Sequence, residues 1–273
     1  MFAAVKTNPF VRKVAIERHR LGRHLSWCTQ MVTFAKTRAV EPLPYKLFSH
    51  KSLLLRKLGD ADMRLQHNKV TNLRLAAAEI DKIVIKPGET FSLWKLVGRP
   101  SAKRGFLPGM LLSNGEIIEG VGGGLCQMAN LLYWMALHSP LTVTERYRHS
   151  FDAFPDSGRV LPFASGATIF YNYVDLQFRN DTGVDFEFRV WVDDEFLQGE
   201  LRTSHQLEHS YAVVERDHRF LKDTKTGKFY RENKLYKRIF DRRTGNLLTD
   251  TLITANHAEM KYQPPAGAQI VLQ

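Results

Sequence analysis

The segment that most constrains this 273-residue chain is a run of three glycines leading directly into a cysteine and a long apolar stretch. Gly122, Gly123 and Gly124 come just before Cys126, and residues 128–137 hold almost no polar side chain. An apolar helix without a polar face is typical of a helix buried on all sides. Glycine lets the backbone take positive φ and lets other groups come close. We therefore expect a glycine turn that delivers Cys126 to the start of a buried helix.

This position favours negative charge, because the first N–H groups of a helix lack intrahelical acceptors and the helix dipole is positive there. We expect the pKa of the Cys126 thiol to be lowered, as a nucleophilic thiolate requires. The N–H groups from Gly124 to Gln127 are candidates for an oxyanion hole, and Gly122 and Gly123 belong to the same anion-binding loop. The alternative is that Cys126 is a small buried apolar residue. Packing alone does not readily explain three adjacent glycines.

A histidine and an aspartate later in the chain complete a candidate catalytic set. His149 is expected on the strand after the buried helix, and Asp175 on the strand after that. A cysteine nucleophile, a histidine base and an acid that orients the imidazole form a known arrangement for acyl transfer. Asp152 and Asp156 lie closer to His149 in sequence and remain alternatives to Asp175. A purely structural role remains the alternative for His149 itself.

The sequence predicts no metal site and no bound cofactor. The histidines and the two cysteines lack the paired spacing of zinc ligands. Residues 120–124 enter a helix as phosphate-binding loops do, but no Walker lysine follows, and no βαβ unit carries a Rossmann pattern. No apolar run is long enough for a transmembrane helix. The first 24 residues have scattered charges rather than a signal peptide, so we expect a cytoplasmic protein.

The positive charge of the chain is concentrated at its start. The net charge is +11, and residues 1–74 hold 15 Lys and Arg against 4 Asp and Glu, whereas the remainder is balanced. Such a segment is suited to a phosphate-bearing ligand or to an anionic membrane surface, which would make the protein peripheral at the membrane. The alternative is a solvated basic helical face. No nucleic-acid-binding motif is present, so no nucleic-acid partner is expected.

The order of patterns predicts an α+β fold with a helical N-terminal part, one buried central helix on a mainly antiparallel sheet, and an additional C-terminal β unit. Helices are expected over residues 9–38, 49–58, 60–81 and 126–137. Strands are expected over residues 83–85, 110–112, 116–118, 142–149, 168–179, 186–192, 196–201, 211–216, 228–240 and 246–255. We divide the chain into a basic helical lead-in (1–81), a core domain (82–203) and a C-terminal β-rich extension (204–273).

Several motifs resemble the VanW family, whose name comes from vancomycin B-type resistance clusters. They are NKVTNL at 68–73, PGETFS at 87–92, GGGLCQ at 122–127, ER at 145–146, HS at 149–150, PF at 162–163, GAT at 166–168, NY at 172–173, DL at 175–176, and Asn180 with Thr182. The glycine–cysteine–glutamine run is the most specific of them. The segment YREN at 230–233 is similar to the longer members. Ala164 departs from the pattern, since glycine is more usual there.

The resemblance implies an association with glycopeptide resistance or cell-envelope metabolism and carries over no catalytic residue. Together with the residues above, it leads to two functional hypotheses. In the first, the protein is a cysteine-dependent acyl-transfer or amide-hydrolysing enzyme that uses Cys126, His149 and Asp175. In the second, it is a non-catalytic binding module for a peptidoglycan precursor or an envelope partner, and the glycine run holds an anionic group.

Overall fold

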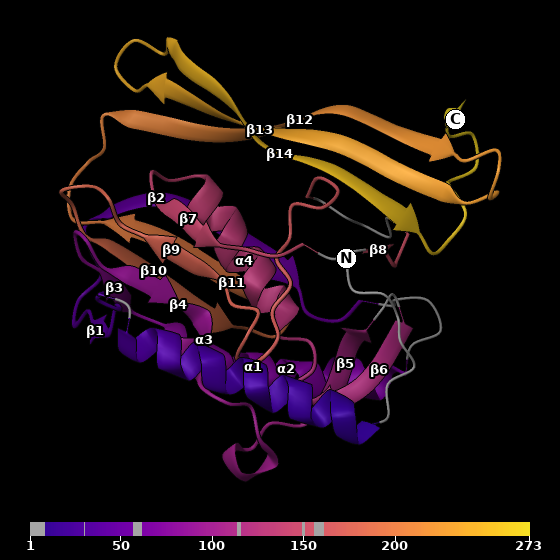
Figure 1. Cartoon of the computed structure of the whole chain (residues 1–273). Helices are drawn as coiled ribbons and strands as arrows, with labels where there is room; N and C mark the ends of the chain where they lie inside the picture. Colours follow the sequence, from indigo (N-terminus) through magenta and orange to yellow (C-terminus); the bar gives the residue numbers. More distant parts are fainter. Residues whose placement is uncertain (1–8, 30, 57–61, 114–115, 149–150, 156–160) are drawn as a thin grey trace.

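A computed structural model describes residues 9–29, 31–56, 62–113, 116–148, 151–155 and 161–273 of the chain. It confirms the α+β fold (Figure 1). The helices are α1 (Pro9–Thr29), α2 (Met63–Ile80), α3 (Leu93–Val97) and α4 (Cys126–Leu137), with a short 3₁₀ turn at Ala102–Arg104. The expected helix at 126–137 therefore matches α4, which is buried from Met128 to Leu137 apart from Asn130.

The core is built on a five-stranded antiparallel sheet in the order β1-β3-β10-β11-β2. Its strands are β1 (Thr37–Arg38), β3 (Ile83–Ile85), β10 (Phe186–Val192), β11 (Phe196–Thr203) and β2 (Tyr45–Leu53). Alternate residues of β10 (Phe186, Phe188 and Val190) are buried in the same core as the apolar residues of α2 and α4. These three side chains point to one face of the strand, which places both helices on that face of the sheet.

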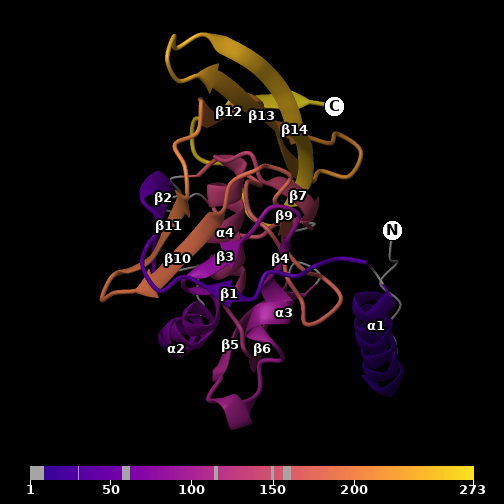
Figure 2. The same ribbon diagram turned by 90° about the vertical axis from the view of Figure 1, so that its left-hand side faces the viewer.

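Two smaller groups of strands and a second five-stranded sheet surround this core. The strands β4 (Thr90–Ser92), β9 (Gln177–Arg179) and β7 (Thr142–Glu145) pair in that order, and β5 (Pro108–Ser113) pairs with β6 (Glu116–Val121) as a hairpin. The C-terminal sheet has the order β15-β12-β13-β14-β8. Its strands are β15 (Ile270–Leu272), β12 (His209–Lys222), β13 (Phe229–Asp241), β14 (Leu247–Met260) and β8 (Phe151–Asp152). Its long strands extend across the molecule above α4, while α1 lies along the opposite side (Figures 1 and 2).

Two local predictions are wrong in this part of the chain. The helix expected at 49–58 is wrong over the described residues 49–56, because residues 45–53 form β2, which pairs with β11 at the edge of the core sheet. Its three consecutive leucines suggested a helix, but β2 supplies the partner that the edge of β11 requires. The helix expected at 9–38 ends at Thr29, and residues 37–38 form β1.

The strand expected at 168–179 is also mostly wrong. Only Gln177–Arg179 form a strand, whereas the residues before them form turns with single bridges between Tyr147 and Thr168 and between Phe170 and Val174. The strand expected at 142–149 ends at Glu145. The hairpin and the three long C-terminal strands are confirmed, and β12 and β14 are longer than expected.

A pocket at the start of helix α4

The glycine run is a tight crossing of backbones. A Cβ on Gly123 would lie 2.1 Å from the carbonyl carbon of Gly109, and a Cβ on Gly124 would lie 2.2 Å from the Lys69 side chain. A Cβ on Gly122 would lie 2.5 Å from Pro100, and both Gly122 and Gly124 have positive φ. Packing and backbone conformation together therefore account for all three glycines without a ligand.

The N–H groups of the glycine run are engaged by the protein itself. Those of Gly122, Gly123 and Gly124 donate to the carbonyls of Leu107, Gly120 and Met110, at 3.0, 3.0 and 2.8 Å respectively. The Gln127 N–H donates to the Gly124 carbonyl at 3.1 Å. Within the described structure, the N–H groups of Leu125 and Cys126 are the two in this run without a carbonyl acceptor. The N–H groups that could meet an anion are therefore those of Leu125 and Cys126, which follow the glycines, and not those of the glycines themselves.

The Gln127 side chain, a candidate for the same anion-binding loop, points to the core sheet. Its amide nitrogen donates to Ser52 Oγ and to the Leu53 carbonyl, both at 2.9 Å. These bonds tie the first turn of α4 to the edge strand β2. Gln127 is therefore an anchor for β2, and its amide nitrogen is not available to a ligand.

Cys126 lies in a pocket at the start of α4 with its side chain partly buried. Burial raises the pKa of its thiol, and this effect outweighs the backbone N–H groups of Ile169 and of Cys126 itself, which favour the thiolate. The expected lowering of the thiol pKa is therefore wrong in direction. The helix start supplies donors near the sulfur, but the apolar surroundings favour the neutral thiol.

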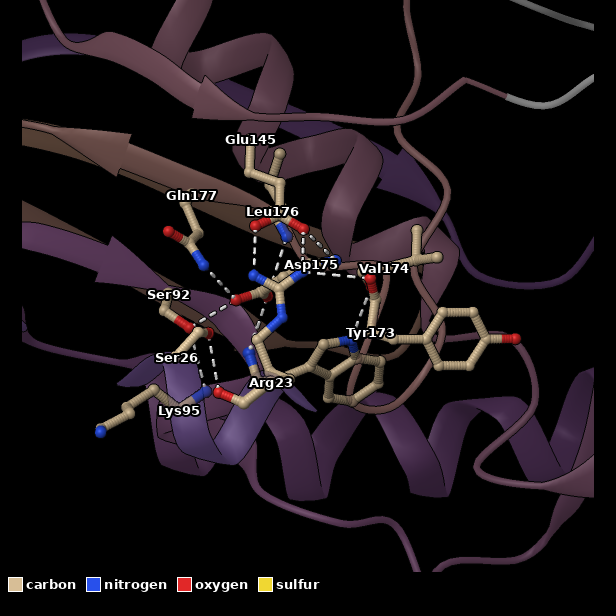
Figure 3. A network of polar contacts seen from close by, with 11 residues as sticks. Arg23, Ser26, Ser92, Lys95, Glu145, Tyr173, Val174, Asp175, Leu176 and Gln177 are labelled. Carbon is tan, nitrogen blue, oxygen red and sulfur yellow. Dashed lines mark hydrogen bonds and ion pairs between the residues drawn. The ribbon is translucent and has the colours of Figure 1, made fainter. Parts of the chain in front are cut away.

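Asp175 forms the centre of a buried polar network (Figure 3). Its carboxylate accepts hydrogen bonds from Ser92 Oγ at 2.6 Å, Trp94 N–H at 3.1 Å, Leu176 N–H at 2.8 Å and Gln177 Nε2 at 3.0 Å. Burial raises the pKa of this carboxyl, and the four hydrogen bonds oppose that rise. Asp175 therefore fixes the start of α3 and is not among the residues that line the pocket.

The other candidate acids and the candidate base are placed differently. Asp152 is buried in β8, the edge strand of the C-terminal sheet, where it accepts a 2.5 Å hydrogen bond from the Tyr262 hydroxyl and pairs with Arg231 at 3.4 Å. His149 and Asp156 lie outside the described residues. The proximity of His149 to Cys126 therefore stays a prediction.

Two arginines that the sequence analysis did not single out line the same pocket. Arg20 comes from α1 and Arg99 from the loop after α3, and the volume of this open pocket is about 100 Å³. Gly122, Leu125 and Cys126 line it from the glycine turn. Trp94, Pro100, Leu111, Val121, Ile169, Phe170 and Tyr171 complete a largely apolar wall.

The charge in the pocket is only partly neutralised. Arg20 Nη1 pairs with Glu17 at 2.5 Å, and Arg99 Nη2 approaches the same Glu17 oxygen at 3.6 Å. Arg20 Nε donates to the Tyr171 carbonyl at 2.9 Å, which holds this guanidinium against the pocket wall. Two guanidinium groups thus share one carboxylate. Nearby, the Leu125 N–H has no carbonyl acceptor among the described residues, and the Cys126 N–H faces its own thiol. This arrangement suits a ligand with a carboxylate or phosphate group.

The wall that α1 forms is held to the core by polar contacts. Arg23 makes a two-pronged ion pair with Glu145, at 2.6 and 2.5 Å, and donates to the Tyr173 carbonyl at 3.0 Å (Figure 3). Glu145 also accepts from the Asp175 N–H at 3.1 Å. The pairing with Glu145 keeps the pKa of Arg23 above its ordinary value despite burial. α1 is therefore joined to the same network that fixes α3.

Among the described residues, no three His, Cys, Asp or Glu side chains come together in a way that could hold a metal ion. No described helix combines the length and the apolar content needed to cross a membrane.

Comparison with known proteins gives consistent results. The family described as VanW like protein matches residues 68–202. The chain is 33% identical over 237 residues to the vancomycin B-type resistance protein VanW of Enterococcus faecalis, covering 87% of this chain and 86% of that protein. It is also 33% identical over 109 residues to the uncharacterized protein YoaR of Bacillus subtilis, covering 40% of this chain and 34% of YoaR. No solved structure matches the chain.

Proposed function

Since the chain belongs to the VanW family, we propose that it takes part in vancomycin resistance by binding an anionic peptidoglycan precursor in the pocket at the start of α4. The observation that carries the proposal is the pair of guanidinium groups, Arg20 and Arg99, that share the single carboxylate of Glu17. A ligand carboxylate would complete the pairing of the second arginine and accept from the N–H groups of Leu125 and Cys126.

The shape of the pocket supports a peptide end rather than a free phosphate. Apolar side chains from four parts of the chain surround the charged groups, and ligand sites commonly combine an apolar lining with a few polar groups that fix orientation. A short peptide with a C-terminal carboxylate offers both an anionic end and apolar side chains. The carboxylate would lie between the arginines, and the side chains would contact the apolar wall.

Calorimetric titration tests this proposal with two synthetic precursor peptides that differ only at the C-terminus. The peptide with a free carboxylate should bind about tenfold more tightly than its amide, because the amide loses the charge-assisted bonds. Arg99→Gln should weaken binding of the acid about fivefold and leave binding of the amide unchanged. Arg18→Gln is the matched control, since Arg18 lies on the exposed side of α1. Equal binding of acid and amide would overturn the proposal.

A second candidate function, acyl transfer or amide hydrolysis through Cys126, is favoured by the position of this thiol in the same pocket. The sulfur would attack a carbonyl carbon of the bound ligand after losing its proton, and the leaving amine would take up a proton. The predicted base is His149. Because burial raises the thiol pKa, this candidate requires a base or a bound ligand to shift the proton.

The two cysteines allow a direct comparison of thiol reactivity. In Cys28→Ser the remaining Cys126 should react with iodoacetamide slowly at pH 7 and faster as the pH rises above about 9, because a raised pKa lowers the thiolate fraction. The control is Cys126→Ser, in which the remaining thiol is the exposed Cys28 and its alkylation rate is measured. Fast alkylation of Cys126 at pH 7 would favour the enzyme. Cys126→Ser should keep peptide binding in the first candidate and lose all turnover in the second.

A further inference from the structure

Helix α1 turns a polar side to the core and an apolar side outward, which is the reverse of most surface helices. Its inward side carries Arg20, Arg23 and Trp27, which are at most partly exposed, and the two arginines are tied to the core by hydrogen bonds. Its outward side carries large apolar residues that are more than half exposed. These outward residues are Val11, Val14, Leu21 and Leu25.

The outward residues form one continuous stripe. Val11, Val14, Arg18, Leu21 and Leu25 are spaced by three and four residues, so they lie on the same face of a helix. We name this set the outer stripe of α1. Figure 2 shows α1 at the side of the molecule, with the rest of the fold on its inward side. A continuous apolar stripe of this kind that is exposed to solvent indicates a binding surface.

We propose that the outer stripe of α1 binds the surface of an anionic lipid bilayer, with the helix lying in the plane of the headgroups. Charge is the first argument. Of the five Lys and Arg in the 21 residues of α1, Arg20 and Arg23 are tied to the core. The other three stand against one acid, Glu17, which is paired with Arg20 and Arg99. Helices with an apolar face and a strongly basic composition bind interfaces that contain anionic lipids.

The position of Arg18 argues against a second copy of the chain as the occupant. Arg18 is at the centre of the outer stripe, seven residues from both Val11 and Leu25. A two-fold pairing of the stripes, parallel or antiparallel, would therefore bring Arg18 against Arg18 and bury two like charges. At a bilayer the Arg18 side chain can reach the anionic headgroups while the apolar residues on either side enter the interface.

The same helix connects this surface to the pocket. Arg20 lines the pocket from the inward side of α1, so a helix lying on the bilayer would hold the pocket next to the headgroups. This orientation would favour ligands that are attached to the membrane. The proposed membrane contact does not depend on what the pocket binds, because the outer stripe and the pocket use opposite sides of α1.

Sedimentation with lipid vesicles tests the inference. The full chain should sediment with vesicles of mixed phosphatidylcholine and phosphatidylglycerol and much less with phosphatidylcholine alone. The double variant Leu21→Ser, Leu25→Ser should lower partitioning onto the mixed vesicles about tenfold, since it removes two apolar anchors. The matched control is Leu247→Ser, Leu248→Ser, which changes two similarly exposed leucines of β14 and should leave partitioning unchanged.

The remaining outcomes are decisive as well. Equal sedimentation with both kinds of vesicle, or equal loss in the control variant, would overturn the inference. A concentration-dependent dimer that dissociates in the Leu21→Ser, Leu25→Ser variant would instead identify a second copy as the occupant. Circular dichroism and titration with the soluble peptide show whether the variant stays folded. Because that peptide needs no membrane, a failure of pocket binding and a failure of vesicle binding are distinguished.

Discussion

The two ends of α4 differ in how their unpaired backbone groups are treated. At the C-terminal end, the Ser139 hydroxyl donates to the Ala136 carbonyl at 2.7 Å, and Lys237 Nζ donates to the Ser139 carbonyl. The His138 ring stacks on Phe48 with centroids 4.0 Å apart. At the N-terminal end, the N–H groups of Leu125 and Cys126 have no carbonyl acceptor within the described residues and lie beside a pocket. The protein closes the C-terminal end of this helix with its own groups, whereas the N-terminal end is the one at which we propose that a ligand binds.

The two ends also share one feature, a lysine that is not paired with a carboxylate in the described structure; Lys69 is buried and Lys237 is partly buried. Lys69 lies against Gly124, and its Nζ donates to Gln66 Oε1 at 2.7 Å. Lys237 reaches the opposite end from β13. Burial lowers the pKa of each lysine to about 8. The difference between the ends therefore lies in the capping groups and not in the burial of charge.

The largest expected effect is that of Gly123→Ala at the open end. The new Cβ would overlap the Gly109 backbone, which cannot move aside as a flexible side chain can. We expect a loss of more than about 3 kcal/mol in the free energy of unfolding, measured by urea denaturation. Gly183→Ala is the control, since its Cβ would meet nothing within 4 Å. A loss below about 1 kcal/mol for Gly123→Ala would show that the glycines serve a ligand rather than the packing.

The next prediction concerns the pH dependence of stability at the two ends. The folded pKa of Lys69 and of Lys237 is about 8, below the ordinary value of about 10.4. Between these values the unfolded chain binds more protons than the folded chain, so each lysine makes stability rise as the pH rises from 8 to 10. Lys69→Met and Lys237→Met should each reduce this rise by about 2 kcal/mol relative to the parent chain.

Denaturation at pH 7, 8, 9 and 10 measures this effect, with Lys36→Met as an exposed control. Similar changes in the two variants would show that burial dominates at both ends. A smaller rise of stability with pH in Lys237→Met alone would show that Lys69 keeps access to water. The region open to solvent at the N-terminal end of α4 would then extend beyond the pocket.

Features that depend on nearby residues could be predicted from the sequence. The apolar run of α4 and the alternation of Phe186, Phe188 and Val190 are visible within short windows, and both are confirmed. The hairpin of β5 and β6 follows from the turn signal between two apolar runs. In these cases local periodicity and tertiary burial agree.

Features set by distant contacts could not be predicted. The helix expected at 49–58 gave way to β2, because β11 provides a partner almost 150 residues away. Arg20 and Arg99 enter the pocket from segments whose patterns carry no site signal, although Arg20 belongs to the basic N-terminal region. The sequence suggests Asp175 as the acid that orients a catalytic histidine, whereas in the structure it holds Ser92 and Trp94, contacts that arise only when the fold is complete.

The smallest expected effect compares one side-chain deletion at each end of α4. Ser139→Ala removes a hydroxyl that both donates to Ala136 and accepts from the Leu141 N–H at 3.2 Å, so it should cost about 1 kcal/mol of unfolding free energy. Cys126→Ala removes a thiol from the edge of a pocket and should cost about 0.5 kcal/mol. Urea denaturation in parallel measures both losses. Added precursor peptide should change the difference in unfolding free energy between the two variants only if it binds the folded chain. If Cys126→Ala costs more than Ser139→Ala without ligand, the thiol is part of the core and the start of α4 is not an open end.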